Sequence, residues 1–130
     1  MQIESAAPTF LVSDVAATAR WYESRLGFAV AGHFPDAEPY SYASLQLGGA
    51  EIMLLALSGY EKPDLSQRRP EGLWDAYIRM SGVRELYDQL EGKDFIHTPL
   101  RKQPYGDWEF EARDPNGYVI VFGGDPQIEE

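Results

Sequence analysis

Hydrophobic and polar positions along this chain follow the pattern of a strand in some segments and the pattern of a helix in others. The same order of strand and helix patterns occurs twice. An apolar run at residues 8–12 is typical of a buried strand. Val15, Ala19, Tyr22 and Leu26 follow it at the spacing of one helix face. The pattern therefore predicts a strand and then an amphipathic helix.

Residues that favour helix ends mark the limits of this helix. Ser13 and Asp14 carry side-chain oxygens that accept hydrogen bonds from the first helical amides. Gly27 readily adopts the left-handed conformation that ends a helix. Three strands are predicted next, at residues 28–34, 40–47 and 50–57, with a tight turn at Gly48 and Gly49 between the last two.

The second half repeats this order after a segment rich in glycine, proline and charged residues. That segment, residues 58–72, is predicted to be a linker or a mobile loop. A strand at 73–80 and an amphipathic helix at 83–90 follow it. The remaining predictions are strands at 95–98, 108–113 and 118–122, an irregular loop at 99–106, a turn at 114–117, turn glycines at Gly123 and Gly124, and a frayed acidic tail at 123–130.

These repeats predict an α+β fold of two tandem βαβββ modules in a single domain spanning residues 1–130. The first module covers about residues 6–57 and the second about residues 73–124. Duplications of this kind commonly form a curved mixed sheet with the helices outside and a concave cavity within. We therefore expect strand residues on the helix-free face to line a cavity.

Composition narrows the classes of partner. The 130 residues include 21 acidic and 11 basic side chains, a net charge of −10, with no basic patch. Such a surface repels nucleic acid and anionic membranes and tolerates cationic ligands. The chain has no cysteine, which excludes disulfides, thiolate metal sites and cysteine nucleophiles, and suits a reducing cytoplasm. No signal peptide or membrane-spanning segment is expected.

Two stretches of sequence resemble a known superfamily. Residues 10–28 (FLVSDVAATARWYESRLGF) resemble the opening of the vicinal oxygen chelate superfamily of glyoxalases, bleomycin resistance proteins and dioxygenases. Residues 103–118 (QPYGDWEFEARDPNGY) are similar to its closing signature, and the chain resembles the bleomycin-resistance-like branch in particular. The resemblance implies the duplicated fold and a homodimer, whereas activity varies widely among proteins that share a fold.

The resemblance also implies where a metal would bind. The metal enzymes of the superfamily place one ligand on each of four strands, and these positions correspond to Ala7, Met53, Asp75 and Val121. Only Asp75 among them suits a hard divalent ion. We therefore expect no metal and no cofactor; enzymatic activity is left open, with a binding role favoured.

Strand alternation selects candidate ligand contacts. In the strand at 73–80, Asp75, Tyr77 and Arg79 share one face, and the apolar face that includes Trp74 is expected to pack on the helix. In the strand at 108–113, Glu109 and Glu111 alternate with apolar residues. The resemblance makes the helix-free face concave, so the predicted contacts are Asp75, Tyr77, Glu109 and Glu111, with Met53 and Val121 as apolar walls and Tyr105 and Trp108 at the rim.

Each candidate also has a purely structural interpretation. Glu109 and Glu111 are also explained as a solvated strand face, or as carboxylates that Arg79 and Arg113 neutralise in an ion-pair cluster. Asp75 is as well explained as a partner of Arg79. Trp108 shares a face with Phe110, which favours the core.

Three functions compete on these grounds. The first is a metal-free protein that sequesters a cationic or aromatic small molecule, such as the glycopeptide bleomycin, in an acidic cavity. The second is a metal-dependent enzyme of the glyoxalase or dioxygenase type with an unusual site of Asp75, Glu109 and Glu111. The third is a binding domain for an unrelated ligand, such as a polyamine or a peptide.

Overall fold

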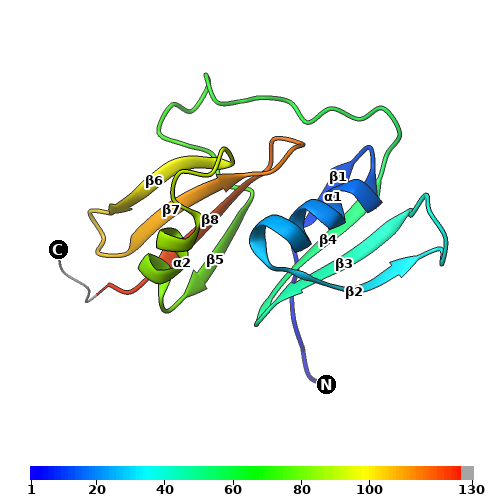
Figure 1. Ribbon diagram of the computed structural model, residues 1–130, viewed down its shortest axis with the longest axis horizontal. Coiled ribbons are helices and arrows are strands. Elements are labelled where there is room, and N and C mark those ends of the chain that lie inside the picture. The colour runs from blue at the N-terminus through cyan, green and yellow to red at the C-terminus, as the bar shows by residue number, and fades with distance from the viewer. Residues whose placement is uncertain (127–130) are drawn as a thin grey trace. The chain divides into compact units, whose positions relative to one another are not determined.

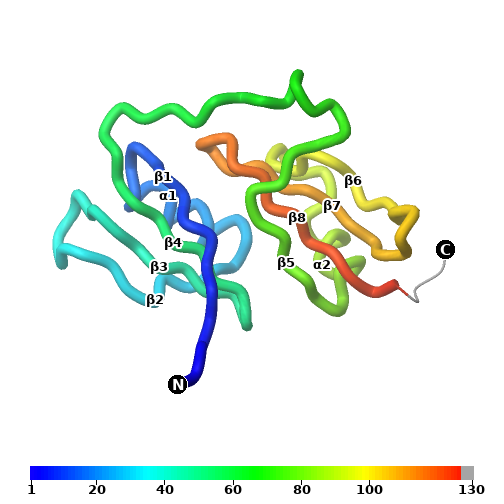
Figure 2. Tube along the Cα trace, turned by 180° about the vertical axis from the view of Figure 1, so that it is seen from behind, coloured from blue at the N-terminus to red at the C-terminus, as the bar shows by residue number. Residues whose placement is uncertain are grey.

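Each half of the chain folds into a four-stranded sheet with a helix on one face (Figure 1). The computed structural model describes residues 1–126. The chain divides into two compact units, Met1–Pro63 and Asp64–Glu130, with the boundary inside the predicted linker. Figure 2 follows the chain from the first unit, coloured blue through cyan to green, along the irregular green segment to the second unit. That the two units form one domain stays a prediction.

The two units have the same order of elements. The first contains β1 (Thr9–Val12), α1 (Val15–Trp21), η1 (Tyr22–Leu26), β2 (Ala29–Phe34), β3 (Tyr42–Leu47) and β4 (Ala50–Ala56). The second contains β5 (Ala76–Met80), α2 (Val83–Leu90), β6 (Ile96–Lys102), β7 (Trp108–Arg113) and β8 (Val119–Gly124).

Both sheets also have the same topology, which confirms the two tandem βαβββ modules. The strand orders are β1-β4-β3-β2 and β5-β8-β7-β6. The first strand of each module pairs in parallel with the last, and the other neighbours are antiparallel.

The helix ends lie where the sequence predicts them. The Asp14 carboxylate accepts a hydrogen bond from the Ala17 amide at 3.0 Å, and Gly27 ends the helical segment with a φ of 80°. The segment Tyr22–Leu26 is a wider π-helical turn rather than a continuation of α1. At α2, the Asp125 carboxylate accepts from the amides of Gly82 and Val83 at 3.0 and 2.7 Å, which ties the chain just after β8 to the start of the helix.

Three local predictions are wrong. Residues 99–102 are not a loop, because β6 continues pairing with β7 through Lys102; β6 is an edge strand, where a proline such as Pro99 is tolerated. Gly123 and Gly124 are not turn residues but the last two residues of β8. Trp74 is not core: it is 48% exposed, because β5 begins only at Ala76 and strand alternation does not extend back to Trp74. The predicted tail lies outside the described residues from residue 127 on.

The hydrophobic core of the second unit lies between α2 and its sheet. The Phe110 ring stacks on Phe122 with centroids 5.1 Å apart and contacts Tyr87 of α2 at 5.2 Å. Both phenylalanines are fully buried. In the first unit, Tyr22 meets Phe28 edge-on at 5.5 Å, and Leu45, Ile52 and Leu54 are buried. One face of each sheet is therefore covered by the helix of the same unit.

The opposite face of the first sheet carries an exposed apolar row. Phe34, Tyr42, Leu55 and Leu11 are consecutive cross-strand neighbours on β2, β3, β4 and β1. Phe34, Leu55 and Leu11 are exposed. Successive strand residues point to opposite faces, so this row shares its face with Met53 and not with the buried Leu54.

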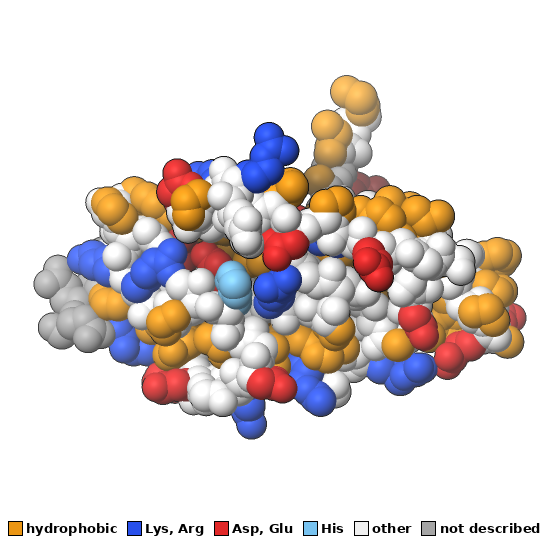
Figure 3. All heavy atoms as spheres, turned by 90° about the horizontal axis from the view of Figure 1, so that it is seen from above, with side chains coloured by type: hydrophobic (Ala, Val, Ile, Leu, Met, Phe, Trp, Pro, Cys, Tyr) orange, Lys and Arg blue, Asp and Glu red, His pale blue; other side chains and the backbone are white. Residues whose placement is uncertain are grey.

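None of the helices within residues 1–126 is long and apolar enough to cross a membrane. On the face drawn in Figure 3, acidic, basic and hydrophobic side chains are mixed, without a broad field of one charge.

Candidate functional site

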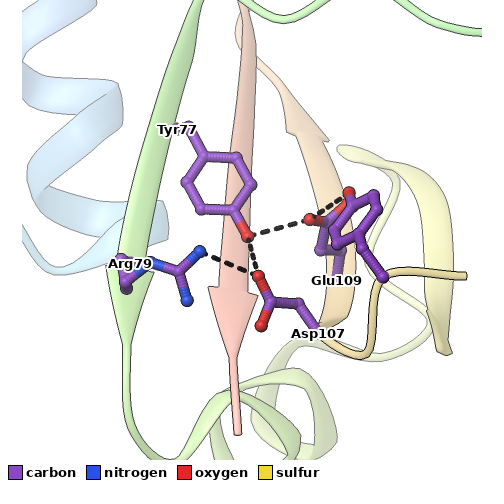
Figure 4. A network of polar contacts seen from close by, with 5 residues as sticks. Tyr77, Arg79, Asp107 and Glu109 are labelled. Carbon is purple, nitrogen blue, oxygen red and sulfur yellow. Dashed lines mark hydrogen bonds and ion pairs between the residues drawn. The ribbon is translucent and has the colours of Figure 1, made fainter. Parts of the chain in front are cut away.

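Polar side chains converge on the helix-free face of the second sheet. Tyr77 and Arg79 come from β5, Glu109 comes from β7, and Asp107 and Tyr105 immediately precede β7. In Figure 4 the Tyr77 ring lies over β8 and reaches toward Asp107 and Glu109. Alternation along β5 and β7 places these side chains opposite the Phe110 core, as the sequence predicts. We call these five residues the carboxylate–tyrosine cluster.

Glu109 is the centre of the cluster. Its Oε2 accepts hydrogen bonds from the hydroxyls of Tyr77, at 2.8 Å, and Tyr105, at 2.6 Å. Glu109 is only 2% exposed, so it is not part of a solvated strand face. Burying a carboxylate is costly unless donors satisfy it, and two short charge-assisted bonds offset that cost.

Asp107 is held in place by hydrogen bonds from Arg79 and Tyr77. Its Oδ2 accepts from Arg79 Nη2 at 2.8 Å, and the Tyr77 hydroxyl lies 3.3 Å from the same oxygen. The hydrogen bond from Arg79 lowers the pKa of Asp107, although burial acts in the opposite direction. Because the Arg79 side chain is 64% exposed, solvent screens this pair, and its contribution to stability is small.

Both tyrosines of the cluster are held in the neutral, donating form. Burial raises the pKa of Tyr77 well above its ordinary value, and the hydrogen bond to Glu109 and the negative charge of Glu109 raise it further. The same causes raise the pKa of Tyr105 to about 12. At neutral pH these two hydroxyls are therefore donors to a charged acceptor.

Alkaline pH is expected to destabilise the protein through these two hydroxyls. Their ordinary pKa is 10.0 and their folded pKa is higher, so their stabilisation is complete below about pH 10 and is lost as pH rises through the folded values, about 12 for Tyr105. Urea midpoints at about pH 8 and about pH 11 should fall more in the wild type than in a Tyr77→Phe, Tyr105→Phe double variant. Equal losses in the two proteins would contradict the prediction.

Glu111 belongs to a separate pair on the same face. Its Oε1 accepts from the Thr98 hydroxyl at 3.0 Å, and Arg101 Nη2 lies 3.8 Å from its Oε2. At 4% exposure, Glu111 is not on a solvated face either. An ion pair does form here, but with Arg101 of β6 rather than with Arg113, because β6 extends beyond its predicted end.

Exposed aromatic rings accompany the buried carboxylates. Trp74 packs against Tyr77 with ring centroids 5.3 Å apart, and the Arg79 guanidinium lies 5.6 Å from the Tyr77 ring centroid. Tyr105 is 60% exposed although its hydroxyl reaches Glu109. A cation at this surface would meet both negative charge and aromatic faces.

The structure brings together some of the predicted contacts and separates others. Tyr77, Glu109 and Tyr105 meet directly, and Val121 is the cross-strand neighbour of Tyr77 and Glu111 on the same face. Trp108 lies on the opposite face of β7, with the Arg84 guanidinium of α2 4.8 Å from its ring centroid. Met53 lies in the first unit, on the face of its exposed apolar row.

Asp75 has a structural partner. Its Oδ2 accepts from the Val119 amide at 2.8 Å, and its own amide donates to the Val119 carbonyl at 2.9 Å, so it fastens β5 to β8. Arg79 pairs with Asp107 instead of Asp75. Strand alternation placed Arg79 on the polar face but did not identify Asp107 as its partner. The alternation of Asp107 with Trp108 was the available signal.

Comparison with known families identifies the chain. The model of the Glyoxalase/Bleomycin resistance protein/Dioxygenase superfamily matches residues 4–122. The chain belongs to this superfamily. No curated protein sequence matches it significantly.

Solved structures of the superfamily share the fold along nearly the whole chain. A bleomycin resistance determinant encoded on the transposon Tn5 is 25% identical, with a TM-score of 0.67, covering 95% of this chain and 98% of its own. The bleomycin-binding protein of bleomycin-producing Streptomyces verticillus, in complex with copper(II)-bleomycin, is 20% identical, with a TM-score of 0.64 and coverages of 94% and 96%. A glyoxalase-related enzyme from Clostridium phytofermentans is 16% identical, with a TM-score of 0.71 and coverages of 95% and 95%.

The residues present do not fit the metal site of the superfamily's enzymes. Of the four positions that the resemblance implies for metal ligands, Ala7 and Val121 have no donor atom, Met53 is a soft ligand, and the Asp75 carboxylate is engaged by a backbone amide. Among residues 1–126, no three His, Cys, Asp or Glu side chains lie close enough together to hold a metal ion. We therefore derive no chemistry through a metal.

Proposed function

We propose that this protein binds and sequesters a small cationic molecule with aromatic character, as bleomycin-binding members of its superfamily bind bleomycin. It acts without metal or cofactor, as a homodimer in the cytoplasm. The ligand-binding surface is the carboxylate–tyrosine cluster together with the exposed Trp74 ring.

One observation carries this proposal: the buried Glu109 carboxylate lies beside partly exposed aromatic rings on the face that the helix does not cover. Glu109 and Asp107 both contact the Tyr77 hydroxyl, so a single donor-rich cation can interact with both carboxylates. The Trp74 and Tyr105 rings would stack on, or lie over, a planar cation. Glu111 and Val121 remain proposed contacts of the same ligand, and Asp75 and Trp108 are proposed to support it from behind the surface. Met53 remains a proposed apolar contact on the first unit considered by itself.

Thermal unfolding with a panel of compounds tests the proposal. Bleomycin at about a hundred times a micromolar dissociation constant should stabilise the protein by about 2.7 kcal/mol, which raises the melting temperature by roughly 10 °C. Spermidine, which is cationic but not aromatic, and a neutral aromatic compound separate the two kinds of interaction. The proposal fails if no cationic compound raises the melting temperature.

The same samples test the proposed dimer. Light scattering at tens of micromolar should give a mass of about twice the 14.6 kDa of one chain. A mass equal to one chain would remove the dimer from the proposal and leave the binding site in place.

A further inference from the structure

Gly123 occupies the middle of the carboxylate–tyrosine cluster without a side chain of its own. It lies on β8 between its cross-strand neighbours Arg79 of β5 and Glu109 of β7. Tyr77 comes from the neighbouring row of β5, opposite Val121. To reach Glu109, its ring must therefore cross β8 at Gly123, as Figure 4 shows for the Tyr77 ring and β8.

The space at Gly123 is too small for any other residue. A Cβ placed there would overlap the Tyr77 hydroxyl oxygen and would lie 2.7 Å from Tyr77 Cζ and 2.9 Å from Glu109 Cγ. The φ of Gly123 is not in the left-handed region, so the backbone conformation itself does not require glycine. Gly124 differs, because it has a φ of 154° and its Cβ would overlap the Met80 carbonyl. Glycine is therefore required at position 123 because the Tyr77 and Glu109 side chains occupy the space that a Cβ would need.

Because the Tyr77 ring crosses β8, the two carboxylate oxygens of Glu109 differ in their hydrogen-bond partners. Oε2 accepts hydrogen bonds from the hydroxyls of Tyr77 and Tyr105, whereas no described residue donates a hydrogen bond to Oε1. Among residues 1–126, no fully buried side-chain oxygen lacks a partner, so Oε1 retains contact with solvent. A carboxylate oxygen only accepts hydrogen bonds, which makes Oε1 an acceptor open to an incoming N–H group.

We propose that Gly123 is the positioning residue of the ligand site. The gap it leaves on β8 lets Tyr77 bind Oε2 of Glu109, which reserves Oε1 for an N–H donor of the ligand, a protonated amine or a guanidinium group. This inference rests on the proposed function and deepens it, because it names the group of the ligand that Glu109 recognises.

A Gly123→Ala variant tests the inference with three measurements. The clash displaces the Tyr77 ring, so the melting temperature should fall by roughly 5–10 °C. Affinity for bleomycin should fall roughly tenfold to a hundredfold, the range expected for a hydrogen bond to a charged group. Carbon-13 NMR of labelled tyrosine, with the Tyr77 signal assigned by a Tyr77→Phe variant, should show the pKa of Tyr77 falling toward its ordinary value.

Two further variants keep the result interpretable. Gly49→Ala, at a glycine with ordinary φ and open space around its Cβ, should change none of the three measurements. In a Tyr77→Leu background the ring is gone, so adding Gly123→Ala should lower the melting temperature much less than it does in the wild type. A full loss in both backgrounds would show that alanine disturbs β8 itself and would overturn the positioning role.

The outcomes also separate this inference from the proposed function. If Gly123→Ala keeps wild-type affinity within about twofold and Tyr77 keeps its raised pKa, Gly123 positions nothing and the inference is wrong. If the wild type binds neither bleomycin nor spermidine, the proposed function and the ligand part of the inference fail together. The NMR titration still decides whether Gly123 sets the contact between Tyr77 and Glu109.

Discussion

A Glu109→Gln variant should bind a cationic ligand roughly tenfold to a hundredfold more weakly than the wild type and still fold. The substitution preserves the shape of the side chain but removes its charge and turns one acceptor oxygen into a donor NH₂ group. A hydrogen bond to a charged group is worth about 1.5–3 kcal/mol, which sets the expected loss of affinity. Isothermal titration with bleomycin measures it directly.

The fold should tolerate this change because the buried charge is itself costly. A neutral amide of the same shape avoids most of the desolvation cost of a buried charge, and its oxygen can still accept hydrogen bonds from the two tyrosine hydroxyls. The tyrosines report on the change independently: without the charge and the hydrogen bond of Glu109, the pKa of Tyr105 should fall below about 12, although burial, the largest cause of its shift, remains.

Glu85→Gln is the matched control for this experiment. Glu85 is an exposed residue of α2, which packs against the other face of the second sheet, and its replacement changes the net charge by the same amount. If affinity falls equally in both variants, general electrostatic attraction explains binding and the carboxylate–tyrosine cluster is not the site.

A Phe110→Ala variant should show the reverse behaviour, losing stability but not affinity. Phe110 is fully buried, stacks on Phe122 and contacts Tyr87 of α2. Truncating a buried phenylalanine costs about 3–5 kcal/mol, which lowers the melting temperature by roughly 12–20 °C. Urea unfolding at 25 °C gives the free energy, and a Phe110→Leu variant, which retains most of the apolar volume, should lose less than about 1.5 kcal/mol.

The two variants test the assignment of the two faces of β7. Glu109 and Phe110 are adjacent in the sequence but point to opposite sides of the sheet. Below its lowered melting temperature, Phe110→Ala should bind bleomycin within about threefold of the wild type. A large loss of affinity in a folded Phe110→Ala protein would mean that the ligand-binding surface extends to the helix side of the sheet.

Much of the fold can be read from the local sequence because it depends on local physics. The helix cap at Asp14, the left-handed Gly27 and the alternation of Glu109 with Phe110 each depend on neighbours a few residues away. The order of elements in the two modules follows from such signals, as does the polar face that carries Tyr77 and Glu109. The superfamily is likewise evident from the opening and closing segments.

Only the tertiary structure decided which groups on that face meet. Tyr77 and Glu109 are 32 residues apart, and their contact depends on β8 lying between β5 and β7 and on Gly123 leaving it open. The sequence alone did not predict Arg101 as the partner of Glu111, because the length of β6 is set by its pairing with β7. Strand order and cross-strand register bring together residues that are distant in the sequence. Neither the order nor the register can be predicted from the local period of hydrophobic positions.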